Sequence, residues 1–380
     1  MLGVVVFLSS TFAFSPMLNL LAVPVIAAAG LLGYRKVFRL RMNYEERAGL
    51  LLVSVASALA AVSFILVGPV IENFEKSLLG SVPYLFMICL AIVVASFVTD
   101  RDLRIIFWLI ILELGVGIAE QLAGTHSFFV EHRGSTEFGE TDLLYYNRVY
   151  GLSDNSSVFA FKLLVAWIYL LFHRSEFARW AFAVLVTVLL VGFLISFNRS
   201  GILAAAVTVL VIYRRNLKFL SAGVVVLIAV MAAIWDSVVY QLLRGRMEFD
   251  YSGRDIVYSE FLKFVIENPV FGNSGAKVWM YFSGRLYHAH NSFLELFASN
   301  GIPVAVIFLI GYALIVRRAW AAVVPVAFYS LFQYGLFWGF VFHDIVLMAI
   351  FMSVARQVDS SGHDSNALGG VHPFRGVTRV

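Results

Sequence analysis

The sequence predicts an all-α protein that crosses a membrane many times. Hydrophobic residues make up 61% of the 380 residues and charged residues only 14%, whereas about a quarter of the residues in a soluble domain are charged. Apolar runs also recur along most of the chain, and many approach the roughly 20 residues that a helix needs to span the hydrocarbon core of a bilayer. Both observations indicate a polytopic integral membrane protein.

The apolar runs predict eleven or twelve transmembrane helices, of which we favour twelve. Residues 1–34 contain Pro16 and Pro24, which interrupt helices, so they are expected to form one long kinked span or two short ones. Residues 320–355 are expected to form two short helices around a re-entry at 338–344. The remaining spans are expected near 48–68, 79–98, 105–123, 155–172, 180–196, 200–213, 219–235 and 290–315.

The basic residues of the short loops predict the orientation, because cytoplasmic loops carry an excess of arginine and lysine. One alternating set of loops holds fourteen basic residues, and the opposite short connections hold only Lys76 and Arg199. The basic side is therefore expected to be cytoplasmic, and the longer loops 124–154 and 236–289 are expected to face outward. The fourteen are Arg35, Lys36, Arg39, Arg41, Arg47, Arg101, Arg104, Arg174, Arg179, Arg214, Arg215, Lys218, Arg317 and Arg318.

Residues 1–355 are interpreted as one transmembrane domain. The segment 356–380, rich in Ser, Gly, His and Asn, is interpreted as a disordered cytoplasmic tail. Binding of a polyanion needs a basic cluster with interleaved stacking residues, and none is evident, so no nucleic-acid partner is expected.

The outward loop 236–289 is predicted to be a folded cap, because 254–267 is amphipathic. One helical face is apolar and the other polar, and Asn268-Pro269 ends the pattern. Such a helix lies on a membrane surface rather than crossing it. The apolar face is formed by Val257, Phe261, Phe264 and Val265, and the polar face by Asp255, Ser259, Glu260, Lys263 and Glu267.

Two arginines of the outward side are candidate anion ligands. Arg199 lies in a very short turn between two apolar runs, and Arg254 starts the amphipathic helix. A guanidinium binds phosphate oxygens through paired hydrogen bonds and keeps its charge, and the amides at a helix start also favour anions. The alternative for each is an anchor to lipid headgroups. Arg244, Arg246 and Arg285 of the same cap are weaker candidates.

Polar residues also gather where the outward cap enters the apolar run 290–315. His290 and Asn291 begin that run, and Glu295 follows one helical turn beyond Asn291 on the same face. Histidine suits proton transfer near neutral pH, although a lone interfacial histidine usually contacts only headgroups or backbone. His288 and His290 lack a third ligand at a recognisable spacing, so no metal is expected.

Three charged residues lie inside apolar runs: Glu113, Glu120 and Lys162. The two glutamates are seven residues apart and share a helical face, so they form either a proton relay or a polar contact between helices. The contact is the favoured interpretation.

Four motifs occur in order along the outward side, and together they resemble the bacterial O-antigen ligase and O-antigen polymerase family. The resemblance covers about 145–315, and Asn198 departs from the usual serine in the first of the long motifs. The segments are Arg148-Val-Tyr-Gly-Leu152, then Ile195-Ser-Phe-Asn-Arg-Ser-Gly201, then Gly253-Arg-Asp-Ile-Val-Tyr with Asn268-Pro-Val-Phe-Gly-Asn-Ser-Gly275, and finally His290-Asn-Ser-Phe-Leu-Glu-Leu-Phe-Ala-Ser-Asn-Gly-Ile302.

The resemblance implies a GT-C-like glycosyltransferase of the bacterial inner membrane, with its site facing the periplasm and no metal or other cofactor. The implied donor is a glycan on undecaprenyl diphosphate, whose reducing-end sugar passes to an acceptor hydroxyl. His290 is implied as the base, with Arg199 and Arg254 holding the leaving diphosphate. The residues implied in substrate binding are Arg148, Asn291, Glu295 and Arg285.

The acceptor stays open at this stage. A polymerase extends another lipid-linked repeat unit, whereas a ligase passes the glycan to lipid A-core or to a protein; we favour the polymerase. Membrane lipids and other polysaccharide-assembly membrane proteins are the further partners expected. A transporter of lipid-linked sugars is less favoured, because it predicts inverted repeats and charges at the middle of the membrane. Aromatic residues near the outer ends either stack on sugars or form an interfacial belt: Tyr145, Tyr146, Tyr150, Trp279, Tyr281 and Tyr287.

Overall fold

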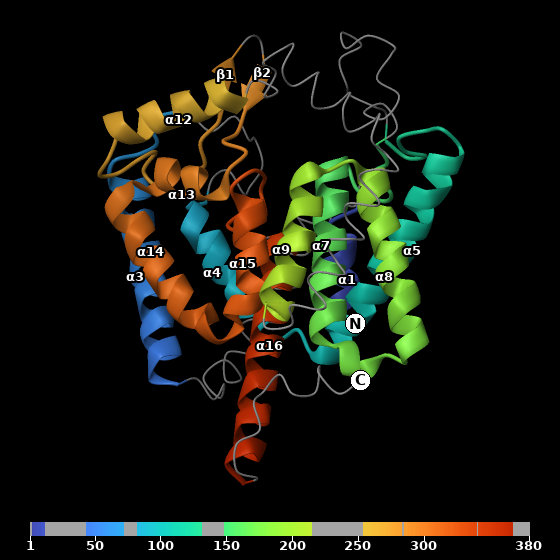
Figure 1. Ribbon diagram of the computed structural model, residues 1–380. Coiled ribbons are helices and arrows are strands. Elements are labelled where there is room, and N and C mark those ends of the chain that lie inside the picture. The colour runs from blue at the N-terminus through green and yellow to red at the C-terminus, as the bar shows by residue number, and fades with distance from the viewer. Residues whose placement is uncertain are drawn as a thin grey trace.

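The computed structural model describes residues 2–11, 43–71, 82–130, 148–214, 254–282, 285–339 and 341–367. Within these ranges the regular structure is helical, apart from one antiparallel hairpin formed by β1 (Met280–Phe282) and β2 (Arg285–Tyr287). Most helices stand side by side, and one helix lies across their upper ends (Figure 1). The all-α membrane fold predicted from the sequence is confirmed.

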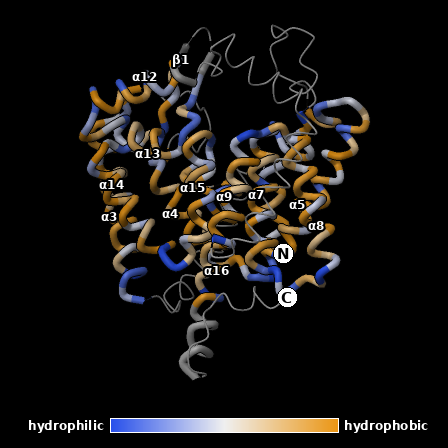
Figure 2. Tube along the Cα trace, in the orientation of Figure 1, coloured by the Kyte–Doolittle hydropathy of each residue, from blue (hydrophilic) through white to orange (hydrophobic). Residues whose placement is uncertain are grey.

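Four helical stretches are long and apolar enough to cross a membrane: Tyr44–Leu66, Asp100–Leu122, Arg179–Ser196 and Ile302–Ser330. Apolar residues run along the bodies of the helices, and hydrophilic residues collect at their two ends (Figure 2). The shorter apolar helices α4 (Tyr84–Ala95), α7 (Ser156–Phe172) and α9 (Arg199–Tyr213) stand among them. The predicted spans at 12–34 and 219–235 lie outside the described residues.

The helices form two groups with a central pair between them. In one group, α3 (Tyr44–Leu66) packs along α14 (Ile302–Val316) and against α4; in the other, α7 packs against α5 (Asp100–Leu122), α8 (Arg179–Ser196) and α9. Between them, α15 (Trp320–Ser330) packs on α9, and α16 (Phe342–Ala367) packs on α4 and α7. The short helix α1 (Leu2–Leu8) packs on α5.

Glycines allow a close approach between α3 and α14. A Cβ atom added at Gly49 of α3 would lie 2.6 Å from the Gly311 carbonyl oxygen, and one added at Gly311 would lie 2.7 Å from the Gly49 oxygen. Small residues at a helix crossing let two backbones meet within a bilayer, where packing rather than apolar burial drives association. This crossing fixes the position of α14, which follows His290 and α13 in the chain.

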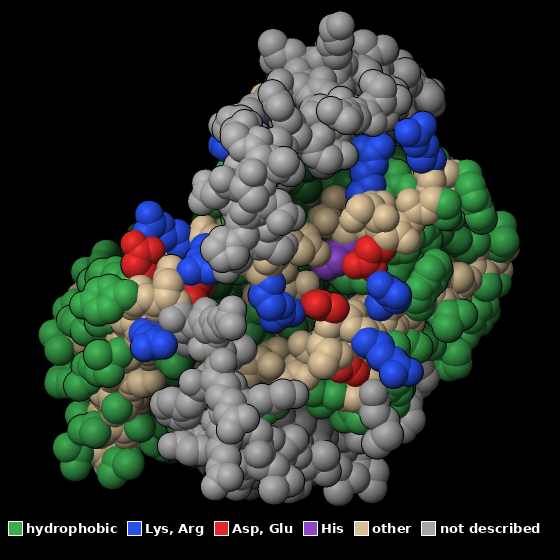
Figure 3. Space-filling model, turned by 90° about the horizontal axis from the view of Figure 1, so that it is seen from below, with side chains coloured by type: hydrophobic (Ala, Val, Ile, Leu, Met, Phe, Trp, Pro, Cys, Tyr) green, Lys and Arg blue, Asp and Glu red, His purple; other side chains and the backbone are tan. Residues whose placement is uncertain are grey.

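The basic residues of this set that the structure describes, from Arg47 to Arg318, lie at one common end of the molecule, as the sequence predicted, whereas those at 35–41 and 215–218 lie outside the described residues. Ion pairs join helix ends and short connections that are far apart in the chain, and Arg and Lys side chains gather on this face (Figure 3). Exposed ion pairs contribute about 0–1 kcal/mol each, so the exposed ones among these report the arrangement more than they stabilise it. The pairs are Arg317 with Glu45, Arg318 with Glu46, Arg104 with Glu176, and Arg356 with Asp100.

Two predictions about the last third of the chain are wrong. The run 290–315 is not one helix: it is divided into α13 (Ser292–Asn300) and α14 by Gly301, whose φ is +75°. Residues 320–355 do hold two helices on either side of a break at 331–341, but α16 is not short, because it extends through Ala367. The helix thus continues beyond residue 356, where the sequence placed the start of a tail.

Candidate functional site

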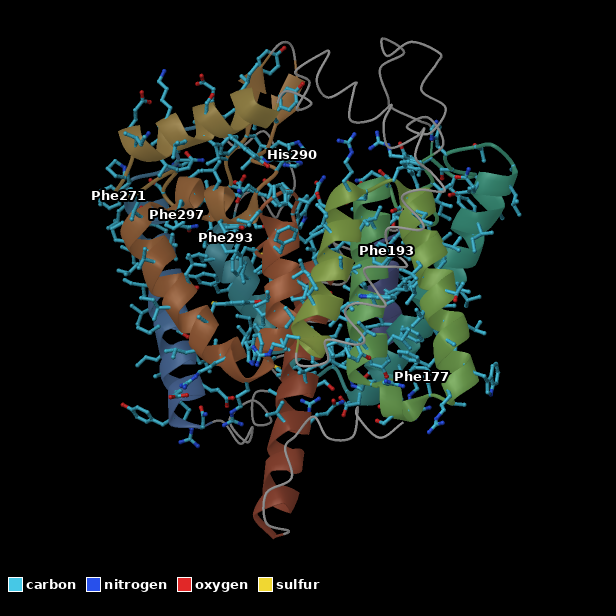
Figure 4. The ribbon with its side chains drawn as sticks, viewed as in Figure 1. Phe177, Phe193, Phe271, His290, Phe293 and Phe297 are labelled. Carbon is cyan, nitrogen blue, oxygen red and sulfur yellow. The ribbon has the colours of Figure 1, made fainter. Side chains whose placement is uncertain are left out.

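The motifs predicted from the sequence converge on the end of the molecule opposite the basic loops, which we term the site end. It carries α12 (Arg254–Glu267), the β1–β2 hairpin, α13 and the first turn of α9 (Figure 1). His290 lies at this end, between α12 and the upper ends of the central helices (Figure 4).

The amphipathic helix of the outward cap is confirmed as α12. The four apolar residues predicted to share a face are buried: Val257 and Phe261 are 3% and 0% exposed, and Phe264 and Val265 are 8% and 7% exposed. They pack with Val278, Ala289 and Ala298 into a small core that is separate from the main one. This small core fixes α12 across the site end, on top of α13.

The motif 268–275 is a corner that locks against the end of α13. The amides of Asn273 and Gly275 donate to the carbonyls of Ala298 and Ser299, at 2.8 and 2.7 Å, and the Ile302 amide donates to Pro269 at 2.7 Å. A Cβ on Gly301 would lie 2.1 Å from the Val270 oxygen. The glycine of the His-Asn motif is therefore required by a close backbone approach as well as by its positive φ.

Asn273 extends this corner to other parts of the fold. Its side chain accepts from the Ile71 amide at 2.7 Å and donates to the Ile71 carbonyl at 3.2 Å. The Gly275 carbonyl accepts from the Tyr84 amide at the start of α4, at 2.8 Å. The motif loop thus fastens α13 to the chain that follows α3 and to α4.

Glu295 is a fully buried structural acceptor. One oxygen accepts from the Val278 amide at 2.9 Å and the Ser299 hydroxyl at 3.1 Å; the other accepts from the Tyr334 hydroxyl at 2.7 Å and the Ala289 amide at 3.4 Å. With four protein donors and no exposed surface, its carboxylate joins α13 to both sides of the hairpin. This placement gives Glu295 a role in holding the site rather than in contacting a substrate.

Asn291 also has a local structural role. Its side-chain oxygen accepts from the amides of Phe293 and Leu294, both at 3.0 Å, so that it caps the N-terminus of α13. Asparagine is among the preferred residues for this position. The Asn of the His-Asn motif therefore starts the helix that directly follows His290.

His290 is half-buried and held in the left-handed region, with φ of +48°. Its amide donates to His288 Nδ1 at 3.2 Å, its carbonyl accepts from the Tyr258 hydroxyl of α12 at 3.3 Å, and the two imidazole rings lie 3.9 Å apart between centroids. An uncommon backbone conformation at a non-glycine residue is a reason to suspect function, because the surroundings must maintain it.

The other non-glycine residues with positive φ in the described ranges lie in two motif segments and in the break between α15 and α16. Phe197 precedes the Arg199 turn, Ser274 lies in the corner loop, and Phe337 precedes Trp338 in the break between α15 and α16. Unusual backbone in this fold is thus concentrated at the site end.

The short turn before Arg199 is built around Asn198. Phe197 ends α8, and the Asn198 side chain accepts from the Gly201 amide at 2.8 Å and donates to the Ser157 hydroxyl at 3.3 Å. Asparagine caps a helix as well as serine does, which explains the departure from the usual motif. Arg199 is the first residue of α9 and is exposed.

The glutamates inside the apolar runs fix the loop that contains Arg148. Glu120 accepts from the amides of Phe128, Tyr150 and Gly151 at 3.0, 3.2 and 2.7 Å. The Arg148 carbonyl lies 2.9 Å from a ring nitrogen of His126. One carboxylate therefore joins both ends of the 124–154 loop.

Glu113 pairs with Lys162 in the core. Lys162 Nζ lies 3.0 Å from both oxygens of Glu113, and both side chains are 0% exposed. The same carboxylate accepts from the Ser153 hydroxyl at 2.7 Å and the Leu152 amide at 3.2 Å. The predicted polar contact between helices is confirmed for Glu113, which meets Lys162 of α7, whereas Glu120 contacts loop amides instead.

Arg254 and Arg285 are placed only through their backbones. Arg254 is the first residue of α12, and Arg285 is the first residue of β2. Both elements belong to the site end, and the side chains of both arginines lie outside the described part of the structure.

A cluster of aromatic rings and one lysine surrounds His288, and we term it the Lys277 cluster: Lys277, Trp279, His288, Tyr334 and Trp338. Lys277 Nζ lies 4.4 Å from the ring centroid of Trp338, 5.4 Å from Tyr334 and 6.0 Å from Trp279. His288 lies 4.3 Å from Tyr334 and 5.9 Å from Trp338.

Sequence reasoning missed most of this cluster. Only Trp279 and His288 had been considered, and nothing in the spacing links Lys277 to Trp338, which follows α13, α14 and α15 in the chain. The structure brings them together because Tyr334 donates to Glu295 of α13.

Within the described ranges, no three His, Cys, Asp or Glu side chains are grouped so that they could hold a metal ion. The His288 ring contacts the rings of Trp279, Tyr334 and Trp338, and the His290 ring contacts that of His288. The absence of a metal requirement stays a prediction, which a chelation experiment tests.

Residues 188–309 match the sequence profile of the O-antigen ligase family. This segment runs from α8 through the Arg199 turn, α12, the corner loop, the hairpin and α13 into α14, and thus contains most of the site end. Searches among curated proteins and among solved structures give no match. The resemblance to the O-antigen ligase and polymerase family is confirmed over this segment.

Proposed function

We propose that this chain, which segment 188–309 places in the O-antigen ligase and polymerase family, is a polysaccharide polymerase. It transfers a glycan from undecaprenyl diphosphate to a sugar hydroxyl of another lipid-linked repeat unit. The reaction takes place at the site end, which faces the periplasm of a bacterium whose inner membrane holds the protein.

The observation that carries this proposal is the position of His290. The imidazole lies at the end of the molecule where α12 covers the helices, and at this end the arginine that heads α9 is exposed (Figure 4). A transfer to a hydroxyl needs a base for the hydroxyl proton and fixed positive charge for the leaving diphosphate. The site end offers both.

The proposed step breaks the bond between the reducing-end sugar carbon and the diphosphate oxygen. The acceptor hydroxyl attacks that carbon, and His290 takes the hydroxyl proton. The two electrons of the broken bond leave with undecaprenyl diphosphate, whose charge Arg199 and Arg254 hold. Arg148 and Arg285 are proposed to bind the substrate from the neighbouring loops. In this proposal neither the attack of the hydroxyl nor the departure of the diphosphate requires a metal.

The membrane geometry also supports a lipid-linked donor. The polyprenyl chain stays in the bilayer while its diphosphate lies at the interface, and α12 lies at that level across the ends of the spanning helices (Figure 1). The small core beneath α12 holds this helix in place, so the cap is a formed surface before the substrate arrives.

Purified protein incubated with lipid-linked repeat units alone tests the proposal. We expect a ladder of lengthened glycans on a gel, and no ladder from His290→Gln or Arg199→Ala. Arg179→Ala is the matched control, because Arg179 is also exposed and heads α8 at the opposite end; it should leave the ladder intact.

The same assay separates the two acceptors. Transfer that occurs only when lipid A-core is added would identify the protein as a ligase rather than a polymerase. Normal ladders from correctly inserted His290→Gln and Arg199→Ala proteins would refute the assignment of the site.

A further inference from the structure

We propose that the Lys277 cluster is a binding subsite for an anionic saccharide, placed beside His290. The proposal rests on the transferase function above but names a feature that the motifs do not contain. Its ligand is one sugar ring with an attached negative charge, which is either the phosphate of the donor or the carboxylate of an acidic sugar in the acceptor.

The charge of Lys277 is the first support. In the described part of the chain, no carboxylate lies within ion-pair distance of its ammonium, and its contacts are with aromatic rings. A half-buried cation with no described carboxylate in direct contact is costly to keep. An anionic ligand would supply the missing charge.

The carboxylates that contact the cluster are already used by other groups. Glu295 accepts four hydrogen bonds, one of them from Tyr334. Asp344 accepts from the amides of Phe337 and Gly339, at 2.7 and 2.8 Å, which fixes the loop that carries Trp338. Both acids therefore hold the walls of the cluster and leave Lys277 to an external anion.

The aromatic rings are the second support. Trp279 and Trp338 are half-buried, and their ring planes are held by neighbours: Tyr334 meets Trp338 edge to face at 4.2 Å, and His288 meets Trp279 at 5.5 Å. Rigid aromatic rings offer a large apolar contact area together with polar edges, which suits the C–H face of a pyranose.

Trp279 adds a donor to this surface. Its indole N–H has no hydrogen-bond acceptor within the described residues. A buried donor without a partner costs about 1–3 kcal/mol, so indole donors usually find an acceptor. A sugar oxygen that entered beside the ring would provide one.

The cluster is adjacent to the transfer site through its histidine. The His288 ring lies 3.9 Å from the His290 ring and contacts Trp279, Tyr334 and Trp338. A saccharide on these rings would thus present its hydroxyls or its phosphate next to the proposed base. This position distinguishes the cluster from an interfacial aromatic belt, which would face lipid.

Saturation-transfer NMR on the full chain in nanodiscs tests the proposal without relying on turnover. The probes are glucose 1-phosphate, glucuronate, methyl glucoside and inorganic phosphate. We expect at least one of the two anionic sugars to bind more tightly than methyl glucoside, with transfer to its ring protons. Lys277→Met should weaken that binding about tenfold or more, which is the usual scale for a charge-assisted contact.

Three variants make the result specific. Lys277→Arg should restore most of the binding, because it keeps the cation. Lys263→Met is the matched control, since it removes an exposed lysine from α12 and should change nothing. Trp338→Leu should weaken anionic and neutral sugars alike. Melting curves confirm that each variant is folded.

The outcomes decide both the site and its ligand. If Lys277→Met weakens the binding of glucose 1-phosphate alone, the subsite belongs to the donor. If it weakens the binding of glucuronate alone, the subsite belongs to the acceptor. Unchanged binding by Lys277→Met, tighter binding of the neutral sugar, or no binding of any probe would overturn the proposal. If no lipid-linked glycan is transferred, the transferase proposal fails while the binding result still decides the subsite.

Discussion

Substitution of Glu295 provides the strongest test of how the site end is held. The residue belongs to the His-Asn motif, and the sequence had suggested a role in substrate binding. In the structure it accepts four hydrogen bonds and is fully buried. We therefore expect Glu295→Ala to destabilise the fold, with loss of activity as a consequence.

The magnitude follows from the four donors. The hydroxyls of Ser299 and Tyr334 can turn toward other acceptors, but the amides of Val278 and Ala289 cannot. Each buried amide left without a partner costs about 1–3 kcal/mol, and the lost side-chain volume adds to this. The free energy of unfolding should therefore fall by about 3–5 kcal/mol. Glu295→Gln keeps the shape and one acceptor oxygen, so about 1–3 kcal/mol is expected.

The assay is thermal and denaturant unfolding in detergent micelles, followed by tryptophan fluorescence, with glycan transfer measured in parallel. Glu267→Gln is the control, because it makes the same chemical change at an exposed residue at the end of α12. A double-mutant cycle with Tyr334→Phe isolates the 2.7 Å hydrogen bond, for which a coupling of about 0.5–3 kcal/mol is expected. A Glu295→Ala protein that melts like the wild type and yet transfers no glycan would refute this reasoning and restore the direct role.

Three further predictions test other parts of the fold. Glu113→Gln and Lys162→Met should each lower the free energy of unfolding by about 3–5 kcal/mol, because either change leaves its partner as an uncompensated buried charge. The double variant should lose less than the sum of the two single losses. Strictly additive losses in denaturant melts would contradict the pairing. Gly301→Ala should destabilise the protein far more than Gly68→Ala. The φ angles are +75° at Gly301 and +76° at Gly68, but only at Gly301 would an added Cβ clash with backbone atoms. Equal melting temperatures of the two variants would be evidence against the contact between the corner loop and the end of α13. Transfer should survive EDTA, and inhibition that added magnesium or manganese reverses would instead establish a metal requirement.

The fold was predictable where a pattern repeats over many residues. Apolar runs gave the helical membrane class, and the periodicity of 254–267 gave the bounds of α12 and its buried face. The division of 290–315 was missed, although Ser299-Asn300-Gly301 and Pro303 interrupt the apolar run and are local turn signals. What the sequence could not show is the approach of Val270, 31 residues earlier in the chain, to Gly301.

The same distinction applies to the site. Motif residues could be found in the sequence, but their roles could not be read from it: Asn291 and Asn198 cap helices, and Glu295 holds the hairpin. Lys277 could not be found at all, because its neighbour Trp338 follows in a loop beyond α14 and α15. The long-range contacts that form the cluster exist only once α13 and the 331–341 break meet.

The His290 ring packs against the His288 ring, and the backbone of His290 gives a final test. At φ of +48°, glycine is easier to accommodate than any residue with a Cβ. The free energy of unfolding of His290→Gly should therefore equal that of His290→Ala or exceed it by up to about 1 kcal/mol. Both variants should lose glycan transfer. An inactive His290→Gly protein that melts above the wild type would be the expected sign of a residue kept for chemistry. If His290→Gly instead melted well below His290→Ala, the backbone at position 290 would not be strained.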